Sequence, residues 1–478
     1  MNTAMKITDI SAIAARPQEG WGLTRPVIDT RSLEQSVAAI LEEVRRDGDI
    51  AVRKFSLFFD KAAPDRAELT FAEIETGAEG ISEELKAAIR QAAANIHVFH
   101  GQQLRVETVV ETLPGVSCWR RPVAIEKVGL YIPGGTAPLF STLLMLAIPA
   151  NIAGCREIIL CSPPDPQGNL HPAILYAAKL VGVTRVFRVG GVQAIGAMAY
   201  GTASIPRVYK IFGPGNQYVT CAKQLVQRDG VAIDMPAGPS EVAVYADGTA
   251  DPAFVAADLL SQAEHGADSQ VVLVSASVEM VERVVAAVDS QVGALPRAEI
   301  ARKALANSRA VIVRDEGQAM DLLNEYAPEH LILACRNPER LAALVVNAGS
   351  VFLGNYSPES VGDYASGTNH VLPTNGYARV YSGVSVDSFV KKITFQQLTR
   401  EGLAGIGPAV MRMAEAEGLE AHARAVGIRL GVVGSEGIGL GGIGSGGGGS
   451  EGTRSEDIGL GGVVSLLWFK RREHILCP

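Results

Sequence analysis

From Val128 onward the chain alternates short β-branched and aliphatic runs with glycine- or proline-containing turns and alanine-rich stretches. Runs of this length and composition predict β-strands, and the alanine-rich stretches between them predict helices. Strands separated by helices pair in parallel, so the sequence predicts an open α/β sheet whose ligands bind at the carboxyl ends of its strands. The expected strands are Val128–Tyr131, Glu157–Cys161, Arg185–Val189, Val208–Phe212 and Glu241–Tyr245.

Two amphipathic helices are expected before this region. Residues 32–46 place aliphatic side chains on one face at helical spacing and are followed by Gly48, a residue that commonly ends helices. Residues 82–99 show a second pattern of this kind. The amino-terminal part of the chain is therefore predicted to be helical.

Glycine-containing turns follow the predicted strands, among them 132–136, 190–193 and 213–216. Glycines at such positions allow backbone amides to approach a phosphate or a cofactor closely. None of these turns carries the GxGxxG pattern of a dinucleotide-binding helix. The literal match at 439–444 lies in a low-complexity tail without a preceding strand, so it does not indicate a nucleotide site.

The composition limits the classes of function. The chain has 478 residues, a formal net charge of -8 and a pI near 5.6, and no long lysine and arginine block that would bind nucleic-acid phosphates. Its length allows at least two hydrophobic cores. Small metabolites are the expected partners.

We expect a cytoplasmic protein that does not enter a membrane. The six cysteines are scattered and form no CxxC pair, which is typical of a reducing compartment. The longest apolar stretch, Leu139–Ala153, is interrupted by Pro149 and Asn151 and is too short to span a bilayer. The first residues do not have the pattern of a signal peptide.

Several histidines in the second half of the chain lie close to carboxylates and amides. Gln262 and His265 are spaced to share one helix face, and Asp363 and His422 add a carboxylate and a second imidazole. A single histidine is more often a surface or core residue, but clustering in turn-type sequence favours a site. Nitrogen and oxygen donors without thiolates favour a catalytic zinc ion.

Long motifs in this chain resemble those of the histidinol dehydrogenase family. They occur in the order of the family, and the likeness covers roughly residues 30–430. The motifs are Val128–Thr136 (VGLYIPGGT), Phe212–Asn216 (FGPGN), Ala232–Glu241 (AIDMPAGPSE), Leu260–Gly266 (LSQAEHG), Ala327–Leu331 (APEHL) and Gly362–Pro373 (GDYASGTNHVLP).

The resemblance implies a zinc-dependent oxidation of L-histidinol to L-histidine through bound L-histidinal, in which two NAD molecules act in turn. By matching motif, Gln262, His265, Asp363 and His422 would bind one Zn²⁺ per subunit. The resemblance also implies a homodimer with shared active sites, in which each His422 reaches the site of the other subunit.

Glu329 and His330 match the family's acid/base pair. His330 would take the proton of the alcohol, and Glu329 would activate water for attack on histidinal. The implied substrate contacts are Ser240, Gln262, His265, His330, Asp363, His370, Glu417 and His422.

The implied NAD contacts lie at the glycine turns of the predicted α/β region. They are Tyr131, Gln193 and Asn216. Tyr131 also suits a packing role at a strand end.

The expected fold class is α/β, with two incomplete Rossmann-like domains that have parallel sheets. Segments 31–132 and 241–378 are predicted to form the domain with the zinc and acid/base residues, and 133–240 the NAD-associated domain. A small amino-terminal arm (1–30) and a helical carboxy-terminal segment (379–430), exchanged between subunits, complete the predicted enzyme. Residues 431–478, with a repeat at 435–442 and 455–462 around a glycine-serine run, are predicted to be a disordered tail outside the family pattern.

Other functions remain open. A cysteine such as Cys118 or Cys155 would allow a thiohemiacetal mechanism, although Glu329 with water makes a thiol unnecessary. A zinc hydrolase would use the same ligands but would not need the glycine-turn region. A non-catalytic relative would lack zinc or acid/base residues, which are all present here. A related dehydrogenase for another amino alcohol or diol is the nearest alternative.

Overall fold

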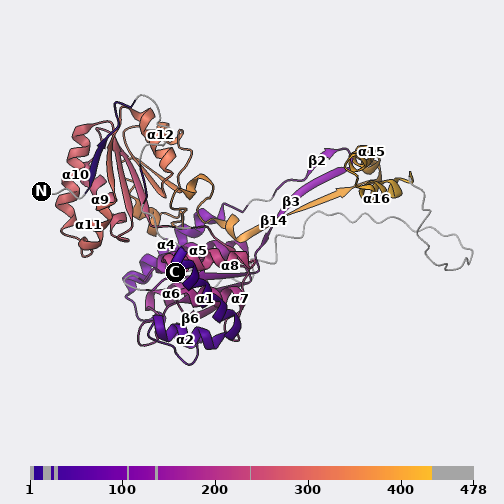
Figure 1. Ribbon diagram of the computed structural model, residues 1–478, viewed down its shortest axis with the longest axis horizontal. Helices are drawn as coiled ribbons and strands as arrows, with labels where there is room; N and C mark the ends of the chain where they lie inside the picture. The colour runs from indigo at the N-terminus through magenta and orange to yellow at the C-terminus, as the bar shows by residue number, and fades with distance from the viewer. Residues whose placement is uncertain are drawn as a thin grey trace, which may run out of the picture. The chain divides into compact units, whose positions relative to one another are not determined.

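The computed structural model describes residues 5–13, 23–25, 31–104, 107–134, 138–236 and 238–432. The chain divides into a larger unit, Met1–Thr112 with Ser117–Gln397, and a smaller unit, Leu113–Val116 with Leu398–Pro478 (Figure 1). The larger unit contains two parallel sheets with helices on both faces. The predicted tail falls, from residue 433 on, outside the described residues.

One sheet has five parallel strands in the order β6-β5-β4-β7-β8. The sequence predicted four of them, although the strand expected from Val208 begins only at Lys210. The chain passes from β4 outward to β6 and then returns to the other side of β4, so the topological switch point lies between β4 and β7. The strands are β4 Lys127–Tyr131, β5 Glu157–Ser162, β6 Arg185–Arg188, β7 Lys210–Phe212 and β8 Ala232–Ile233.

Helices cover both faces of this sheet. On one face the apolar side chains of α3, α4, α5 and α6 pack together with alternate strand residues, and on the other those of α1, α2, α7 and α8 do so. The helices are α1 Arg31–Asp47, α2 Asp49–Phe59, α3 Phe71–Ala78, α4 Glu83–Gly101, α5 Phe140–Ala153, α6 Pro172–Val181, α7 Gly191–Tyr200 and α8 Gln217–Arg228.

The packing of the first 130 residues corrects the predicted domain boundaries. Residues 31–132 were expected to join 241–378, but α1 and α4 pack on the five-stranded sheet and β4 is its central strand. Leu33, Val37, Leu41 and Val44 do form the predicted buried face of α1. Helical periodicity shows that a face is buried but not which sheet covers it, because both sheets offer the same kind of aliphatic surface.

The second sheet has six parallel strands in the order β1-β11-β10-β9-β12-β13. Helices α9, α10 and α11 pack on one face, and α12 and α13 on the other. The elements are β1 Lys6–Asp9, β9 Glu241–Ala246, α9 Pro252–Ala263, β10 Gln270–Ser275, α10 Val278–Val292, α11 Ala298–Ala306, β11 Arg309–Ile312, α12 Glu316–Tyr326, β12 His330–Ala334, α13 Pro338–Ala342, β13 Ser350–Leu353 and α14 Glu359–Tyr364.

The remaining elements form a three-stranded sheet of order β14-β3-β2 and a pair of helices, α15 and α16. The helices pack closely where Gly407 of α15 faces Leu430 of α16. The carboxy-terminal segment expected at 379–430 is helical from Arg400 on but contains the strand β14 before that, and its exchange between subunits stays a prediction. The bounds are β2 Val110–Leu113, β3 Val116–Ala124, η1 Tyr377–Arg379, η2 Val386–Phe389, β14 Val390–Leu398, α15 Arg400–Ala416 and α16 Glu420–Leu430.

Helix α5 contains most of the longest apolar stretch of the sequence. Its residues from Ser141 to Ala150 are all buried, which explains why the helix is apolar on every side. It ends at Gly154, whose left-handed conformation caps the last turn. Within the described parts of the chain, no helix has the length and apolar character needed to cross a membrane.

Gly213, directly after β7, has no room for a side chain. Its φ is +129°, and a Cβ there would lie 2.0 Å from the carbonyl oxygen of Tyr131 in the neighbouring strand β4. Its backbone is also held on both sides, because its amide donates to Asp234 Oδ2 (2.8 Å) and its carbonyl accepts from Lys223 Nζ (2.8 Å). The buried Lys223–Asp234 ion pair thus fixes the turn at the switch point.

We expect Gly213→Ala to destabilise the folded chain by about 3 kcal/mol, since the collision is with backbone and the bonded turn resists a shift. The matched control is Gly230→Ala, where φ is also positive (+86°) but no atom lies within 4 Å of the added Cβ. Chemical denaturation of both variants measures the difference. Equal free energies of unfolding for the two variants would contradict a collision of the added Cβ with the Tyr131 carbonyl oxygen.

Candidate active site

The amino-terminal edge of the six-stranded sheet brings the predicted acid/base pair together with a zinc-ligand candidate. His330 is the first residue of β12, Glu329 precedes it, and Glu241 begins the neighbouring strand β9. Helix α9 runs back along the sheet, so Gln262 in its last turn arrives at the same edge. This is the opposite edge from the one at which the strand pattern predicted ligands.

Hydrogen bonds hold Glu329 and His330 in place. The Glu329 carboxylate accepts from the Glu241 amide at 2.8 Å and lies 3.4 Å from the side-chain nitrogen of Gln262. His330 Nδ1 lies 3.0 Å from that nitrogen and 3.1 Å from the Glu241 carbonyl oxygen. His330 Nε2 lies 3.4 Å from Asp363 Oδ1. The imidazole is therefore held between the Asp363 carboxylate and the Glu241 carbonyl oxygen.

Burial and charge set the protonation of the pair. Burial raises the pKa of Glu329 to about 8, although the charge of His330 opposes this shift. For His330 burial acts to lower the pKa, but the charges of Glu329, Asp363 and Glu359 outweigh it and raise the pKa to about 10. These charges favour the protonated form of His330, and neutralising the negative charge beside it would favour the form that accepts a proton.

Asp363, on α14, lies among three histidines. Burial acts to raise its pKa, but the adjacent imidazole of His330, 3.4 Å away, and the charges of His370 and His265 lower it. His370 Nδ1 lies 2.6 Å from the Asp363 carbonyl oxygen. His265 lies two residues after the end of α9, and the charge of Asp363 acts on it as well. The structure therefore assembles Gln262, His265, Asp363 and His370 with the acid/base pair.

The donors present fit a zinc ion. Gln262 Oε1 is buried and has no hydrogen-bond partner, which is costly unless a ligand satisfies it. An amide oxygen, an imidazole and a carboxylate are donor types that zinc accepts. Among the described residues no three His, Cys, Asp or Glu side chains are grouped as metal ligands. Of the predicted zinc ligands in the larger unit, only His265 and Asp363 are residues of these four types.

Three predicted contacts lie outside this cluster or at its border. Ser240 immediately precedes β9, and its carbonyl oxygen accepts from the Gln270 amide at 3.2 Å. Glu417 follows the last residue of α15, and His422 lies in the first turn of α16, so both belong to the smaller unit. Both are exposed.

The predicted NAD contacts lie at the carboxyl edge of the five-stranded sheet, but their side chains differ in access. Tyr131 is 4% exposed and its hydroxyl accepts from the Gly191 amide at 3.1 Å. Gln193 is 0% exposed and donates to Asp60 at 3.2 Å. Asn216 is exposed, and its side chain caps α8. In this conformation Tyr131 and Gln193 are buried, and Asn216 is the exposed one of the three; their contacts with NAD stay a prediction.

Sequence reasoning missed several side chains that shape the site. Arg25 binds the buried Glu241 carboxylate through Nε (2.5 Å) and Nη2 (3.0 Å), and nothing near Arg25 in the sequence indicates this. Glu359 is 1% exposed and accepts from Ser261 at 3.0 Å, and burial raises its pKa to about 8. It lies one helical turn before Asp363, a spacing that places both on one face and that the sequence does contain.

The pKa of His330 offers a test of this geometry. Asp363→Asn removes a carboxylate 3.4 Å from the ring and is expected to lower the pKa of His330 from about 10 toward neutrality. The folded chain binds the His330 proton more tightly than the unfolded chain does. The protonated imidazole therefore stabilises the folded chain fully below about pH 6.5, and this stabilisation is lost as the pH rises toward 10.

Titration of the histidine resonances by NMR in the metal-free chain measures this pKa. The control is Asp258→Asn, a half-buried carboxylate on α9 that is not among the charges acting on His330. An unchanged His330 pKa in the Asp363 variant would contradict the assigned contact.

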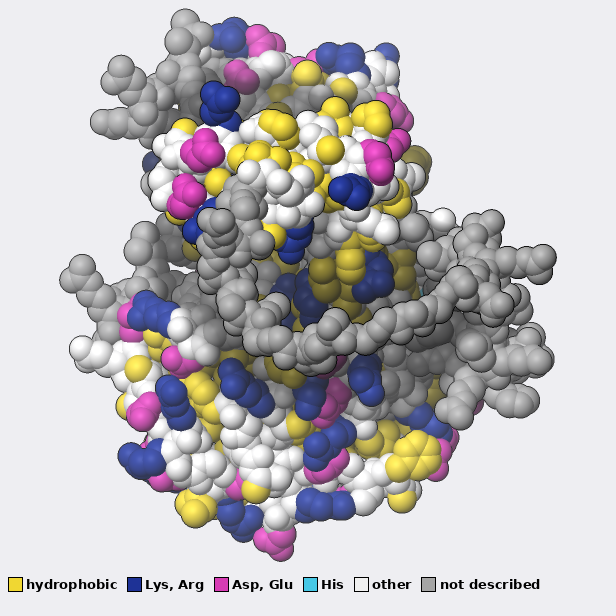
Figure 2. Space-filling view, turned by 90° about the vertical axis from the view of Figure 1, so that its right-hand side faces the viewer, with side chains coloured by type: hydrophobic (Ala, Val, Ile, Leu, Met, Phe, Trp, Pro, Cys, Tyr) yellow, Lys and Arg dark blue, Asp and Glu magenta, His cyan; other side chains and the backbone are white. Residues whose placement is uncertain are grey.

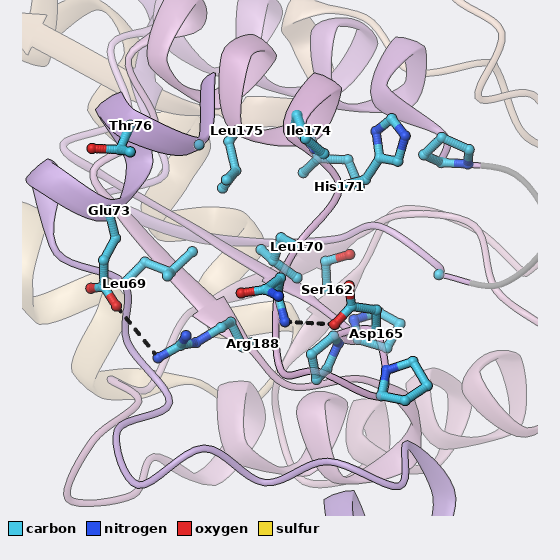
Figure 3. A pocket seen from close by; sticks show the side chains of 18 of the residues that line it. Leu69, Glu73, Thr76, Ser162, Asp165, Leu170, His171, Ile174, Leu175 and Arg188 are labelled. Carbon is cyan, nitrogen blue, oxygen red and sulfur yellow. Dashed lines mark hydrogen bonds and ion pairs between the residues drawn. The ribbon is translucent and has the colours of Figure 1, made fainter. Parts of the chain in front are cut away.

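The surface drawn in Figure 2 is mixed in character: basic, acidic and apolar side chains are interspersed on it. A cavity of about 940 Å³ lies beside α3, α6 and the end of β5, with Glu73 and Arg188 facing each other across 3.8 Å on its wall (Figure 3). None of the predicted site residues lines it.

Comparisons with known proteins agree on one family. The family model described as histidinol dehydrogenase matches residues 23–430. The chain is 59% identical to histidinol dehydrogenase of Bacteroides thetaiotaomicron over 415 residues, covering 86% of this chain and 97% of that protein. It is 54% identical to the enzyme of Xylella fastidiosa over 432 residues, covering 90% and 100%. The crystal structure of histidinol dehydrogenase from Elizabethkingia anophelis superimposes with a TM-score of 0.87 at 51% identity, covering 90% of this chain and 98% of that one.

Proposed function

The chain belongs to the histidinol dehydrogenase family and oxidises histidinol in histidine biosynthesis, and we propose that it does so with NAD and one zinc ion per subunit. The observation that carries the proposal is the buried cluster of Glu329, His330, Gln262 and Asp363 at one sheet edge. The overall reaction takes two hydrides and three protons from histidinol and one water, converting the alcohol to a carboxylate through the aldehyde.

Gln262, His265 and Asp363, with His422 of a second subunit, would hold the zinc ion. When bound, zinc would orient the amino group and imidazole of the substrate and supply positive charge beside the reacting carbon. Because Asp363 is also the anionic partner of His330 Nε2, neutralising its charge lowers the pKa of His330 and prepares it to accept a proton.

His330 would accept the hydroxyl proton while hydride leaves the carbinol carbon for NAD. Glu329 is held by the Glu241 amide, so its carboxylate keeps one orientation through both steps. In the second step it would accept a proton from the water that attacks histidinal, and the hydrated aldehyde would give its hydride to a second NAD. The raised pKa of Glu329 suits this role, because a carboxylate with a raised pKa is a stronger base than a carboxylate in water.

The homodimer, the NAD contacts and the cytoplasmic location belong to the proposal as well. His422 and Glu417 are exposed on the smaller unit, which leaves them accessible to a second copy of the chain. Asn216 lies beside the switch point of the five-stranded sheet, where nucleotides bind in folds of this type. Oxidation of a related amino alcohol or diol is the remaining alternative, because the acid/base pair acts on the hydroxyl-bearing carbon and does not recognise the rest of the substrate.

The proposal is tested with the purified full chain, histidinol and NAD. We expect two NADH per histidinol, loss of activity with a zinc chelator, and recovery on adding Zn²⁺. Parallel assays with other amino alcohols and with ester or amide substrates distinguish the alternatives. A higher kcat/KM for another amino alcohol would assign the chain a different substrate, and hydrolysis without NADH formation would exclude the dehydrogenase.

A further inference from the structure

Thr142 lies in the first turn of α5, far from the site residues in sequence, yet it contacts one of them. Its hydroxyl oxygen lies 3.0 Å from His370 Nε2, and the residue is 2% exposed. The contact joins a helix of the five-stranded sheet to the loop that follows α14. None of the sequence motifs that led to the site includes Thr142.

The two neighbours of His370 determine its tautomer. The Asp363 carbonyl oxygen, 2.6 Å from Nδ1, can only accept, so Nδ1 carries a hydrogen. In the neutral ring Nε2 is then bare, and the Thr142 hydroxyl 3.0 Å away donates to it. Both ring nitrogens are used, and the plane of the ring is fixed.

A second bond holds the same loop to α5. The side-chain amide of Asn369, next to His370, donates to the Met145 carbonyl oxygen at 2.7 Å, and its oxygen accepts from the Val371 amide at 3.0 Å. The loop backbone is thus anchored without Thr142. Removing the Thr142 hydroxyl should free the His370 ring but leave the loop in place.

We propose that Thr142 is a positioning residue for substrate binding, which acts by fixing the ring plane of His370. The inference rests on the proposed function, in which His370 contacts the substrate. A neutral ring held in one orientation presents a fixed surface to the flat, N–H-bearing imidazole of the substrate. Freeing the ring adds an entropic cost to each binding event and leaves Nε2 without its donor.

The test compares Thr142→Val, which keeps the side-chain shape, with Thr142→Ser, which keeps the hydroxyl. We expect the valine variant to raise the KM for histidinol about tenfold, as for a lost buried hydrogen bond, with a much smaller change in kcat. The serine variant should restore a KM close to that of the unchanged chain. If the side chain only filled space, the valine variant, which keeps the methyl group, would have a normal KM, and the serine variant, which lacks it, would have the raised KM.

A second measurement does not depend on activity. NMR of the full chain with ¹⁵N-labelled histidine should show His370 of the unchanged protein as the Nδ1–H tautomer with a hydrogen-bonded Nε2, and in Thr142→Val an Nε2 resonance without that hydrogen bond. A different tautomer in the unchanged protein would overturn the inference even if the valine variant failed to fold. So would an unchanged KM in Thr142→Val when His370→Ala raises it. Absence of histidinol-dependent NADH formation in the unchanged chain would contradict the proposed function instead.

Discussion

Replacing His330 by asparagine is expected to lower the rate of histidinol oxidation about 10³-fold. Asparagine keeps a polar side chain of similar reach at the start of β12, but it cannot accept the alcohol proton. No second base occupies the place of the imidazole, because the ring lies directly between Asp363 (3.4 Å) and the Glu241 carbonyl oxygen (3.1 Å). Steady-state rates with histidinol, and separately with histidinal, measure the effect.

The comparison between the two substrates makes this prediction specific. Oxidation of added histidinal should fall much less, because the proton of the attacking water is assigned to Glu329. The matched control is His97→Asn, the same chemical change at an exposed position of α4. Near-normal turnover of histidinol by the His330 variant would remove it from the role of base.

Glu329→Gln is expected to slow the second oxidation about 10²- to 10³-fold while the first proceeds. Glutamine can still accept the hydrogen bond from the Glu241 amide, so the geometry at 2.8 Å is kept and only the basic carboxylate is lost. The variant should form one NADH per histidinol in the early phase instead of two, and histidinal should accumulate. Trapping of the aldehyde together with NADH yield measures this.

Loss of charge at a buried site can also alter folding, and the control addresses this. Glu299→Gln changes an exposed carboxylate on α11 and should have normal yield and rates. In the Glu329 variant removal of a buried carboxylate with a raised pKa should leave stability at pH 8 unchanged or higher, because the unfavourable ionisation is gone. Two NADH per histidinol at the normal rate would exclude Glu329 as the base of the second step.

Local patterns in the sequence predicted many of the elements. The helix expected at 82–99 occurs as α4, for which Ser82 is the N-cap, and β4, β5, β6 and β9 occur close to the predicted bounds. These segments follow from short-range preferences, namely β-branched runs, helical spacing and capping. The strand expected from Val208 is shorter because Val208 instead donates its amide to the Met198 carbonyl oxygen.

The site was predicted less evenly. The motifs around Gln262, Glu329 and Asp363 led to residues that the structure does bring together. The motifs gave no information on Arg25 or Thr142, which contact the site across more than two hundred residues of sequence, and no short pattern encodes such a pairing. Glu359 was missed as well, although its spacing of four residues from Asp363 can be read from the sequence.

The sequence by itself determined the type of fold, the family, and the chemical groups available for zinc binding and proton transfer. The tertiary structure decided which sheet the first helices cover, and that the reactive cluster lies at the amino edge of the six-stranded sheet. It also decided the protonation of that cluster. A pKa depends on burial and on charges within a few ångströms, and these distances exist only after α9, β12 and α14 have packed together.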